Sequence, residues 1–204
     1  EQIASFHAYL ADLSDDGNPE RVGRINITVN LLPMLGVQPL LGRQFTEEEE
    51  QPGRDRVVII SYGLWQRRFG GTAEILNKTI TINGEPRTII GVMPEGFNFP
   101  RGTEMPSGYH LPERAELWTP LAQNAEFWAK HTQRGLIFMG RLKSGVTQSQ
   151  AQAEMDSIAA EQATASPQSH EGWLIWLTPL FNQIVGQSRT PLLVLLGAVG
   201  FLLL

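Results

Sequence analysis

The chain has 204 residues, 42% of them hydrophobic and 18% charged, so it can bury a sizeable core as one large or two small domains and is not an intrinsically disordered chain. Its net charge of −5 argues against a nucleic-acid-binding protein, which needs a basic surface to displace counterions from phosphates. Cysteine is absent, which excludes disulfides, thiolate catalysis and cysteine-based zinc sites.

The first fifty residues predict two strands, a short helix and a capped turn. Residues 3–10 read as a short strand, 22–30 alternate as a strand does, and the polar stretch 12–20 between them predicts a turn. Residues 31–35 allow only one or two turns of helix before Gly36.

Thr46 marks a further helix start, because Glu49 stands where a capping box places its second member. We interpret the four glutamates of residues 47–50 as a solvated helix turn. A cation-binding cluster is the alternative, although nothing nearby supplies complementary ligand spacing.

Residues 56–60 form a continuous apolar run that is typical of a buried strand. Ser61 can cap a helix over residues 62–69, with Ile60 and Trp65 placed as a hydrophobic staple. Arg67 and Arg68 lie in its last turn, and Gly70-Gly71 end it.

A β-hairpin follows, because strands 79–82 and 87–92 flank the dipeptide Asn83-Gly84. A strict two-residue turn would set Ile80 opposite Arg87. A longer loop through Pro86 sets Ile80 opposite Ile89 instead, and we expect this second register.

Beyond a long irregular excursion over residues 94–114, we expect strands at 117–121, 136–142 and 173–177. The strongest helix pattern covers residues 146–162: Thr147 caps it, Gln150 completes a capping box, and Ala151, Met155, Ile158 and Ala159 share one face. The order of elements predicts an α+β fold.

The last residues, 190–204, carry no charge and almost no polar side chain. They are too short to span a bilayer, which requires about 20 apolar residues in a helix. A buried core helix is the alternative interpretation, but no face of the segment is polar. We expect the start of a transmembrane helix here.

No catalytic or metal-binding constellation is visible in the sequence. The four histidines, His7, His110, His131 and His170, do not stand at metal-ligand spacing. Nucleophile elbows, phosphate loops and dinucleotide fingerprints are missing. We therefore expect a protein that is not an enzyme and that holds no cofactor or metal.

Aromatic residues suggest one contact site. Of the five tryptophans, Trp128 stands beside Phe127 in an otherwise polar stretch. We expect Trp128 and Phe127 to form an exposed contact. Core packing accounts for the other tryptophans, with a sugar-binding platform as the alternative.

Five sequence blocks stand out along the chain: TVNLLPMLGVQPLLGRQF (28–45), VVIISYGLWQRRFGG (57–71), ILNKTITINGEPRTIIGVMPEGFNFP (75–100), AELWTPL (115–121) and GRLKSGVTQSQAQAEMDSIAAE (140–161). Together they resemble the periplasmic core domain of MacB-like ABC-transporter permeases, of the FtsX/MacB type, and they look most like the duplicated permeases without a fused ATPase. The order and spacing of the blocks carry the resemblance, which covers nearly all of the chain.

The resemblance implies two subdomains. A porter-like α/β subdomain would comprise residues 1–48 and 133–188, and a β-rich, Sabre-like insertion would comprise residues 54–125, before the membrane segment 190–204. Family members usually carry a strand and a helix before the region equivalent to Ile3, so we expect the first subdomain to be incomplete.

The resemblance also implies a function. The chain would be a non-catalytic domain on the periplasmic side of the inner membrane, coupling ATP-driven motion of membrane helices to export or mechanotransmission. Its partners would be a cytoplasmic ABC ATPase acting through those helices, a second permease half or copy, and a periplasmic adaptor.

Two other hypotheses stay open. One is a membrane-tethered module that binds a lipid, peptide or glycan in a cleft lined by Trp128 or Trp118. The other is a membrane-anchored hydrolase, which requires a bonded histidine–carboxylate pair, for instance around His131.

Overall fold

The computed structural model describes residues 2–14, 19–101, 112–122, 136–165 and 174–183. The chain divides into two compact units. The first comprises residues 1–102 and 110–141, and the second comprises residues 103–109 and 142–204.

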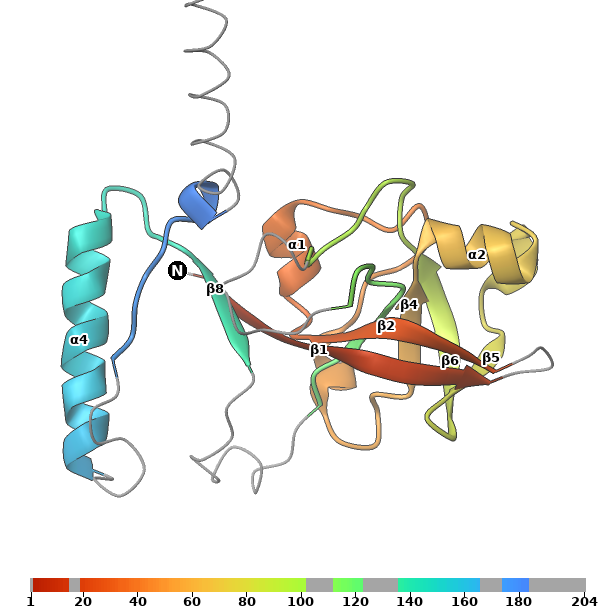
Figure 1. The fold of residues 1–204 in the computed structure, drawn as a ribbon, viewed down its shortest axis with the longest axis horizontal. Helices are drawn as coiled ribbons and strands as arrows, with labels where there is room; N and C mark the ends of the chain where they lie inside the picture. The colour runs from red at the N-terminus through yellow and green to blue at the C-terminus, as the bar shows by residue number, and fades with distance from the viewer. Residues whose placement is uncertain (1, 15–18, 102–111, 123–135, 166–173, 184–204) are drawn as a thin grey trace, which may run out of the picture. The chain divides into compact units, whose positions relative to one another are not determined.

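Six strands of the first unit close into a barrel (Figure 1). They pair in the order β1-β2-β7-β4-β6-β5, and β5 returns to β1. The pairs β2–β7 and β4–β6 are parallel and the others antiparallel. Their bounds are β1 (Gln2–Ser14), β2 (Glu20–Ile27), β4 (Val57–Ile60), β5 (Thr79–Ile82), β6 (Glu85–Val92) and β7 (Leu117–Pro120). Two more strands join this sheet, β3 (Leu41–Gly42) on β6 and β8 (Ile137–Arg141) on β1.

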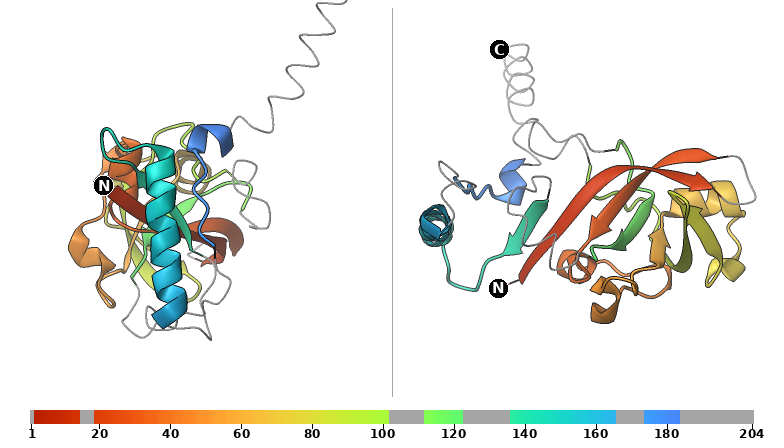
Figure 2. Two further views of the ribbon diagram at one scale, coloured as in Figure 1. Left: turned by 90° about the vertical axis from the view of Figure 1, so that its left-hand side faces the viewer. Right: turned by 90° about the horizontal axis from the view of Figure 1, so that it is seen from below.

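Strand β1 is longer than the predicted 3–10, and its ribbon runs the length of this unit (Figure 2). Phe6 pairs with Ile27 of β2 and with Ile137 of β8, so these two strands lie on opposite edges of β1. At the other end, Leu13 pairs with both β2 and β5. One strand therefore belongs to the barrel and to the β8 pairing at once.

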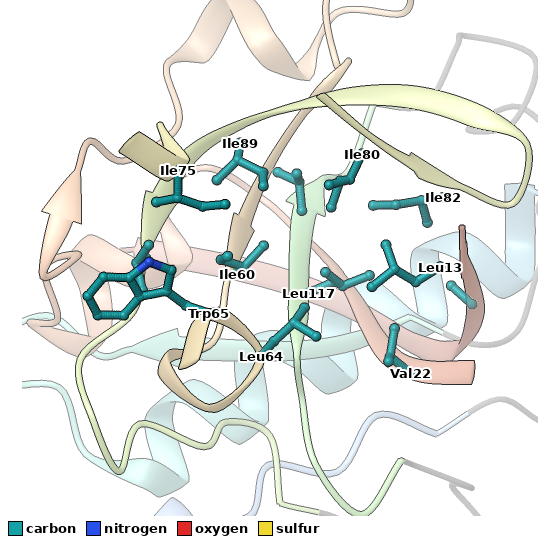
Figure 3. Close-up of a cluster of buried hydrophobic side chains, with 13 residues drawn as sticks. Leu13, Val22, Ile60, Leu64, Trp65, Ile75, Ile80, Ile82, Ile89 and Leu117 are labelled. Carbon is teal, nitrogen blue, oxygen red and sulfur yellow. The ribbon is translucent and has the colours of Figure 1, made fainter. Parts of the chain in front are cut away.

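Apolar side chains fill the barrel (Figure 3). Alternate residues of the strands point inward, as the pleat dictates. Ile80 and Ile82 of β5 meet Ile60 and Leu117 from the opposite wall. Each buried Leu or Ile side chain contributes on the order of 1.5–3 kcal/mol. This interior is the main core of the unit.

Helix α2 (Tyr62–Phe69) supplies Leu64 and Trp65 to this core. Its predicted caps are confirmed: the Ser61 hydroxyl accepts the Leu64 N–H at 3.0 Å, and Gly70 ends the helix in the left-handed conformation. The Trp65 indole N–H donates to the carbonyl of Thr72 at 2.9 Å. That bond fixes the chain entering η2 (Ala73–Ile75).

The two short predicted helices exist, with one correction. Helix α1 (Leu31–Leu35) ends at Gly36 as expected. The segment after Thr46 is a 3₁₀ turn, η1 (Glu47–Glu50), and it is not wholly solvated, because Glu49 is buried. The Glu49 carboxylate accepts the Thr46 N–H at 2.9 Å, as the capping box predicted, and it also binds Arg43.

The expected hairpin register is wrong. Asn83 and Gly84 form a strict two-residue turn with φ of 52° and 81°, and Ile80 lies opposite Arg87. The arginine can occupy this inward position because Asp55 and Glu85 pair with its guanidinium. The positive charge of Arg87 was the reason to expect a longer turn, and these two acids neutralise it in the folded chain.

The second unit contains helix α4 (Gln148–Ala165), which begins where the sequence predicts. Thr147 donates its N–H to the Gln150 side chain at 2.9 Å and accepts the Gln150 N–H at 3.3 Å. Of the predicted apolar face, Ala151 and Ala159 are buried, whereas Ile158 is exposed. A strand was expected at 173–177. The residues of this range that the structure describes, 174–177, belong to no strand, so the prediction is wrong there.

The mixed helix and strand content agrees with the predicted fold class. The division into porter-like and Sabre-like parts stays a prediction. Among the described residues, no helix has the length and apolar character needed to cross a membrane. Residues 190–204 lie outside the described residues.

Candidate functional site

A polar cluster lies in the wall of the barrel where β1, β2 and β7 meet. The Arg24 Nε–H donates to the Thr119 hydroxyl at 2.9 Å, and that hydroxyl donates to the Asn26 side chain at 2.5 Å. Tyr9 donates its O–H to the same Asn26 oxygen at 3.1 Å, and its ring lies 5.3 Å from the Arg24 guanidinium carbon. Burial lowers the pKa of Arg24 by removing its solvation. The cluster ties three strands together.

A second buried arginine joins β6 to the residues before β4. Arg87 contacts the Asp55 carboxylate at 3.2 Å and Glu85 at 3.0 Å, and it also donates to the Asp55 carbonyl. Its side chain is only 5% exposed. This ion pair links positions 32 residues apart in sequence.

An ion network on the surface fastens the end of α2 to the sheet. Arg67 contacts Glu116 at 3.0 Å and Glu20 at 2.6 Å, and Arg68 contacts Glu20 at 3.3 Å. The hydrogen bond to Glu116 raises the pKa of Arg67. The predicted role of these arginines was to complement the carbonyl end of the helix. Their ion pairs with Glu20 and Glu116 are a further role, which the sequence did not predict.

The junction between β1, β2 and β8 has its own hydrogen bonds. Ser5 and Thr28 bind reciprocally: the Ser5 N–H donates to the Thr28 hydroxyl at 3.0 Å and the Thr28 N–H donates to the Ser5 carbonyl at 2.9 Å. The Asn30 side chain donates to the carbonyl of Ile3 at 2.8 Å. From β8, Arg141 donates to the Met34 carbonyl at 2.6 Å. We call these six residues the β1 junction.

The sequence did not single out the β1 junction, because each bond joins residues that are distant along the chain. Ser5 and Thr28 are 23 residues apart, and Arg141 and Met34 are 107 residues apart. The alternation that predicts the strands carries no information about which strand pairs with which.

These polar groups bind one another and do not form an acid–base or metal constellation. Within the described part of the chain, no three His, Asp or Glu residues lie close enough to hold a metal. His7 lies beside Tyr9, with ring centroids 5.4 Å apart, and burial lowers the pKa of His7. The other three histidines, and the predicted contact residues Trp128 and Phe127, lie outside the described residues.

Comparison with known proteins decides the family. Residues 2–158 match the family model of the MacB-like periplasmic core domain. The chain belongs to this family. The predicted resemblance is thereby confirmed, and it places the chain among the MacB-like periplasmic domains of ABC permeases.

Solved structures of MacB-like and related domains share the fold. The periplasmic region of MacB from Actinobacillus actinomycetemcomitans is 16% identical with a TM-score of 0.57, over 83% of this chain and 69% of that one. The extracellular domain of the ABC-type transporter YknZ from Gram-positive bacteria is also 16% identical with a TM-score of 0.57, over 83% of this chain and 78% of that one. No curated protein matches the sequence.

Proposed function

We propose that this domain transmits mechanical work in an ABC-type permease. Cytoplasmic ATP hydrolysis would move the membrane helices, and the domain would carry that motion to an extracytoplasmic cargo, an adaptor, or a second permease half or copy. Such a task requires stiff bodies joined at a hinge, and it requires no reactive group.

The observation that carries this proposal is that β1 pairs both with strands of the barrel and with β8. Residues 2–6 pair with β8, residues 6–13 pair with β2, and residues 13–14 pair with β5. A displacement of β8 therefore reaches the barrel through one continuous strand and its backbone hydrogen bonds. The β1 junction prevents β1 from sliding against the end of β2.

The barrel itself suits the role of a stiff body. Its closed strand order leaves little freedom for the walls to shear, and the Arg24 and Arg87 clusters cross-link strands that are remote in sequence. A close-packed interior transmits strain because it is hardly compressible.

The membrane part of the proposal rests on the sequence of residues 190–204, which we take as the start of a transmembrane helix. We assign residues 1–48 and 133–188 to a porter-like part and residues 54–125 to a Sabre-like part, so that the barrel combines β1 and β2 of the former with β4 to β7 of the latter. The domain would lie on the periplasmic side of the inner membrane.

Distance measurements between spin labels test the proposal, because the chain has no cysteine to interfere. In the reconstituted permease with its ATPase, one pair would join Leu40→Cys to Ser157→Cys of α4. Both positions are exposed, and they belong to different units. We expect the distance distribution of this pair to change between the nucleotide-free and the ATP-trapped states.

The control pair joins Leu10→Cys to Leu40→Cys, two exposed positions of the first unit. We expect the distance distribution of this pair to be the same in all nucleotide states, because both labels would be attached to the same stiff body. A nucleotide-dependent change within this pair, or a constant distance between Leu40 and Ser157, would contradict the proposed lever.

We also propose Trp128 and Phe127 as an exposed contact for the partner, on the basis of their sequence setting alone. Replacing both with serine should weaken adaptor or partner binding without changing the thermal stability of the domain. If the double variant instead loses affinity for a lipid, peptide or glycan, the tethered binding module would be the better description.

A further inference from the structure

The segment 174–181 exposes its largest apolar side chains. Leu174 is 71% exposed, Trp176 78% and Phe181 73%, whereas Ile175 and Leu177 are half-buried. The prediction of core packing is therefore wrong for Trp176. Few large hydrophobic side chains of a soluble surface are this open, and several in one short stretch indicate an interaction site.

The exposure of Leu174 and Trp176 follows from how the segment is held. The Gln152 side chain of α4 donates to the Ile175 carbonyl at 2.6 Å and accepts the Leu177 N–H at 2.9 Å. Gln148 donates to the Leu177 carbonyl at 3.0 Å. Two glutamines thus take the place of a neighbouring strand and orient the segment, so that its alternate residues face away from the helix.

The sequence that follows indicates what covers these side chains. Between residues 172 and 204 the only charged residue is Arg189. Phe181 precedes the apolar segment 190–204 by nine residues. A fully extended chain of that length spans at most about 32 Å. The surface of any bilayer that the segment 190–204 enters is therefore within reach of Phe181.

Trp176, Phe181 and Leu174 are residue types that favour the interface between a bilayer and water. Tryptophan is enriched where a bilayer meets water, and exposed aromatic and aliphatic side chains there insert by about 5–10 Å. The exposed acids of α4, Glu154, Asp156 and Glu161, rule out a basic patch on that helix. Attraction to the bilayer would then come from apolar burial, and salt should not weaken it.

We propose that Trp176 and Phe181, with Leu174, lie in the interfacial layer of the bilayer and seat the second unit on the membrane surface. This inference rests on the proposed function, because it requires residues 190–204 to enter the membrane. It goes further in naming the side chains that contact lipid and in giving the glutamines of α4 a positioning role.

Single-cysteine variants of the full chain, carrying an environment-sensitive dye, test the inference in phosphatidylcholine vesicles. Trp176→Cys and Phe181→Cys report on the contact, Leu196→Cys reports on the membrane segment, and Leu40→Cys is the water-exposed control. Doxyl-labelled lipid should quench the dye at 176, 181 and 196 and leave it bright at 40. Raising the salt from about 0.1 M to about 1 M should leave this pattern unchanged.

The other outcomes separate the two proposals. If the dye at 196 is quenched but those at 176 and 181 match position 40, the interfacial contact is wrong and the membrane segment stands. If the dye at 196 also stays in water, both proposals fail. A dye at 176 that is shielded from water but not quenched by lipid would mean a protein neighbour, which equally rejects the lipid contact. Unchanged thermal transitions would show that each variant folds.

Discussion

Asp12 and Asn83 hold each other through two hydrogen bonds. The Asp12 N–H donates to the Asn83 side-chain oxygen, and the Asn83 N–H donates to the Asp12 carbonyl, both at 2.8 Å. Asn83 is the first residue of the β5–β6 turn, so this reciprocal pair fastens the hairpin tip to β1 beside the short β1–β5 ladder. It helps to close the barrel where only two residue pairs join β1 to β5.

Asn83→Ala should destabilise the domain by about 1.5–3 kcal/mol. The left-handed backbone at Asn83 costs about 1–2 kcal/mol for an ordinary residue, and the lost hydrogen bond adds about 1 kcal/mol. Asn83→Asp keeps the acceptor and tolerates the conformation, so its loss should be much smaller. Urea titrations of the two variants compare these values, and equal losses would show that the side-chain bond is unimportant.

Gly42→Ala should cost far more than Gly53→Ala, although both glycines have similar positive φ, 80° and 88°. A Cβ on Gly42 would lie 2.0 Å from the Ile90 carbonyl oxygen, whereas a Cβ on Gly53 meets nothing within 4 Å. Gly53→Ala should lose about 1 kcal/mol from backbone strain alone. Gly42→Ala adds a clash of about 1–3 kcal/mol, because the backbone opposite cannot rotate away. Thermal unfolding of both variants measures the difference, and equal midpoints would contradict the close approach.

The buried pair of Arg87 and Asp55 should respond unequally to loss of each partner. Asp55→Ala leaves the guanidinium buried with only the residue-55 carbonyl and the exposed Glu85 as partners, and should cost about 3 kcal/mol. Arg87→Met fills the same space with an apolar chain and leaves the partly solvated Asp55, so about 1 kcal/mol is expected. The control is Glu85→Ala, a surface change worth about 0.5 kcal/mol or less. Denaturant midpoints of the three variants test this order, and a larger loss in Arg87→Met than in Asp55→Ala would refute it.

Stability should fall in acid through Glu49. Burial alone would raise its pKa, but hydrogen bonds from Arg43 and the Thr46 backbone outweigh that effect and hold the pKa below its usual value of 4.5. A lowered pKa in the folded state stabilises the fold above pH 4.5, and this contribution disappears as the pH falls below it.

The measurement is the thermal midpoint as a function of pH across that range, compared with Glu49→Gln. The variant should be less stable near neutrality and should lose less stability as the pH is lowered. Glu47→Gln, at an exposed position of the same turn, should keep the slope of the original chain. If Glu49→Gln keeps that slope as well, another carboxylate governs the acid response.

Local signals were sufficient where a structure depends on neighbours in sequence. The caps of α2 and α4 were predictable because Ser61 and Thr147 bond to groups three residues away. The register of the β5–β6 hairpin was not, because Arg87 finds Asp55 only in the folded chain. Barrel closure could not be predicted from the sequence either. Strands β2 and β7 pair across more than 90 residues, as the Arg24–Thr119 bond shows.

The strand prediction at 173–177 was wrong for a related reason. This segment has the apolar character of a strand, yet a strand requires a partner edge, and two glutamine side chains hold the segment instead. The β1 junction was missed because its polar residues have no distinctive spacing. The family, in contrast, could be predicted, since its blocks follow one another in a fixed order along the chain.

The pairing of β1 with β8 has a consequence for biogenesis. Strand β1 is synthesised well before Ile137–Arg141, so this edge of β1 stays incomplete until β8 has emerged. Contacts between such distant segments form slowly, because a long loop has to close first. The nascent domain would thus expose an unpaired strand edge until β8 is available, and such an edge is a target for chaperones.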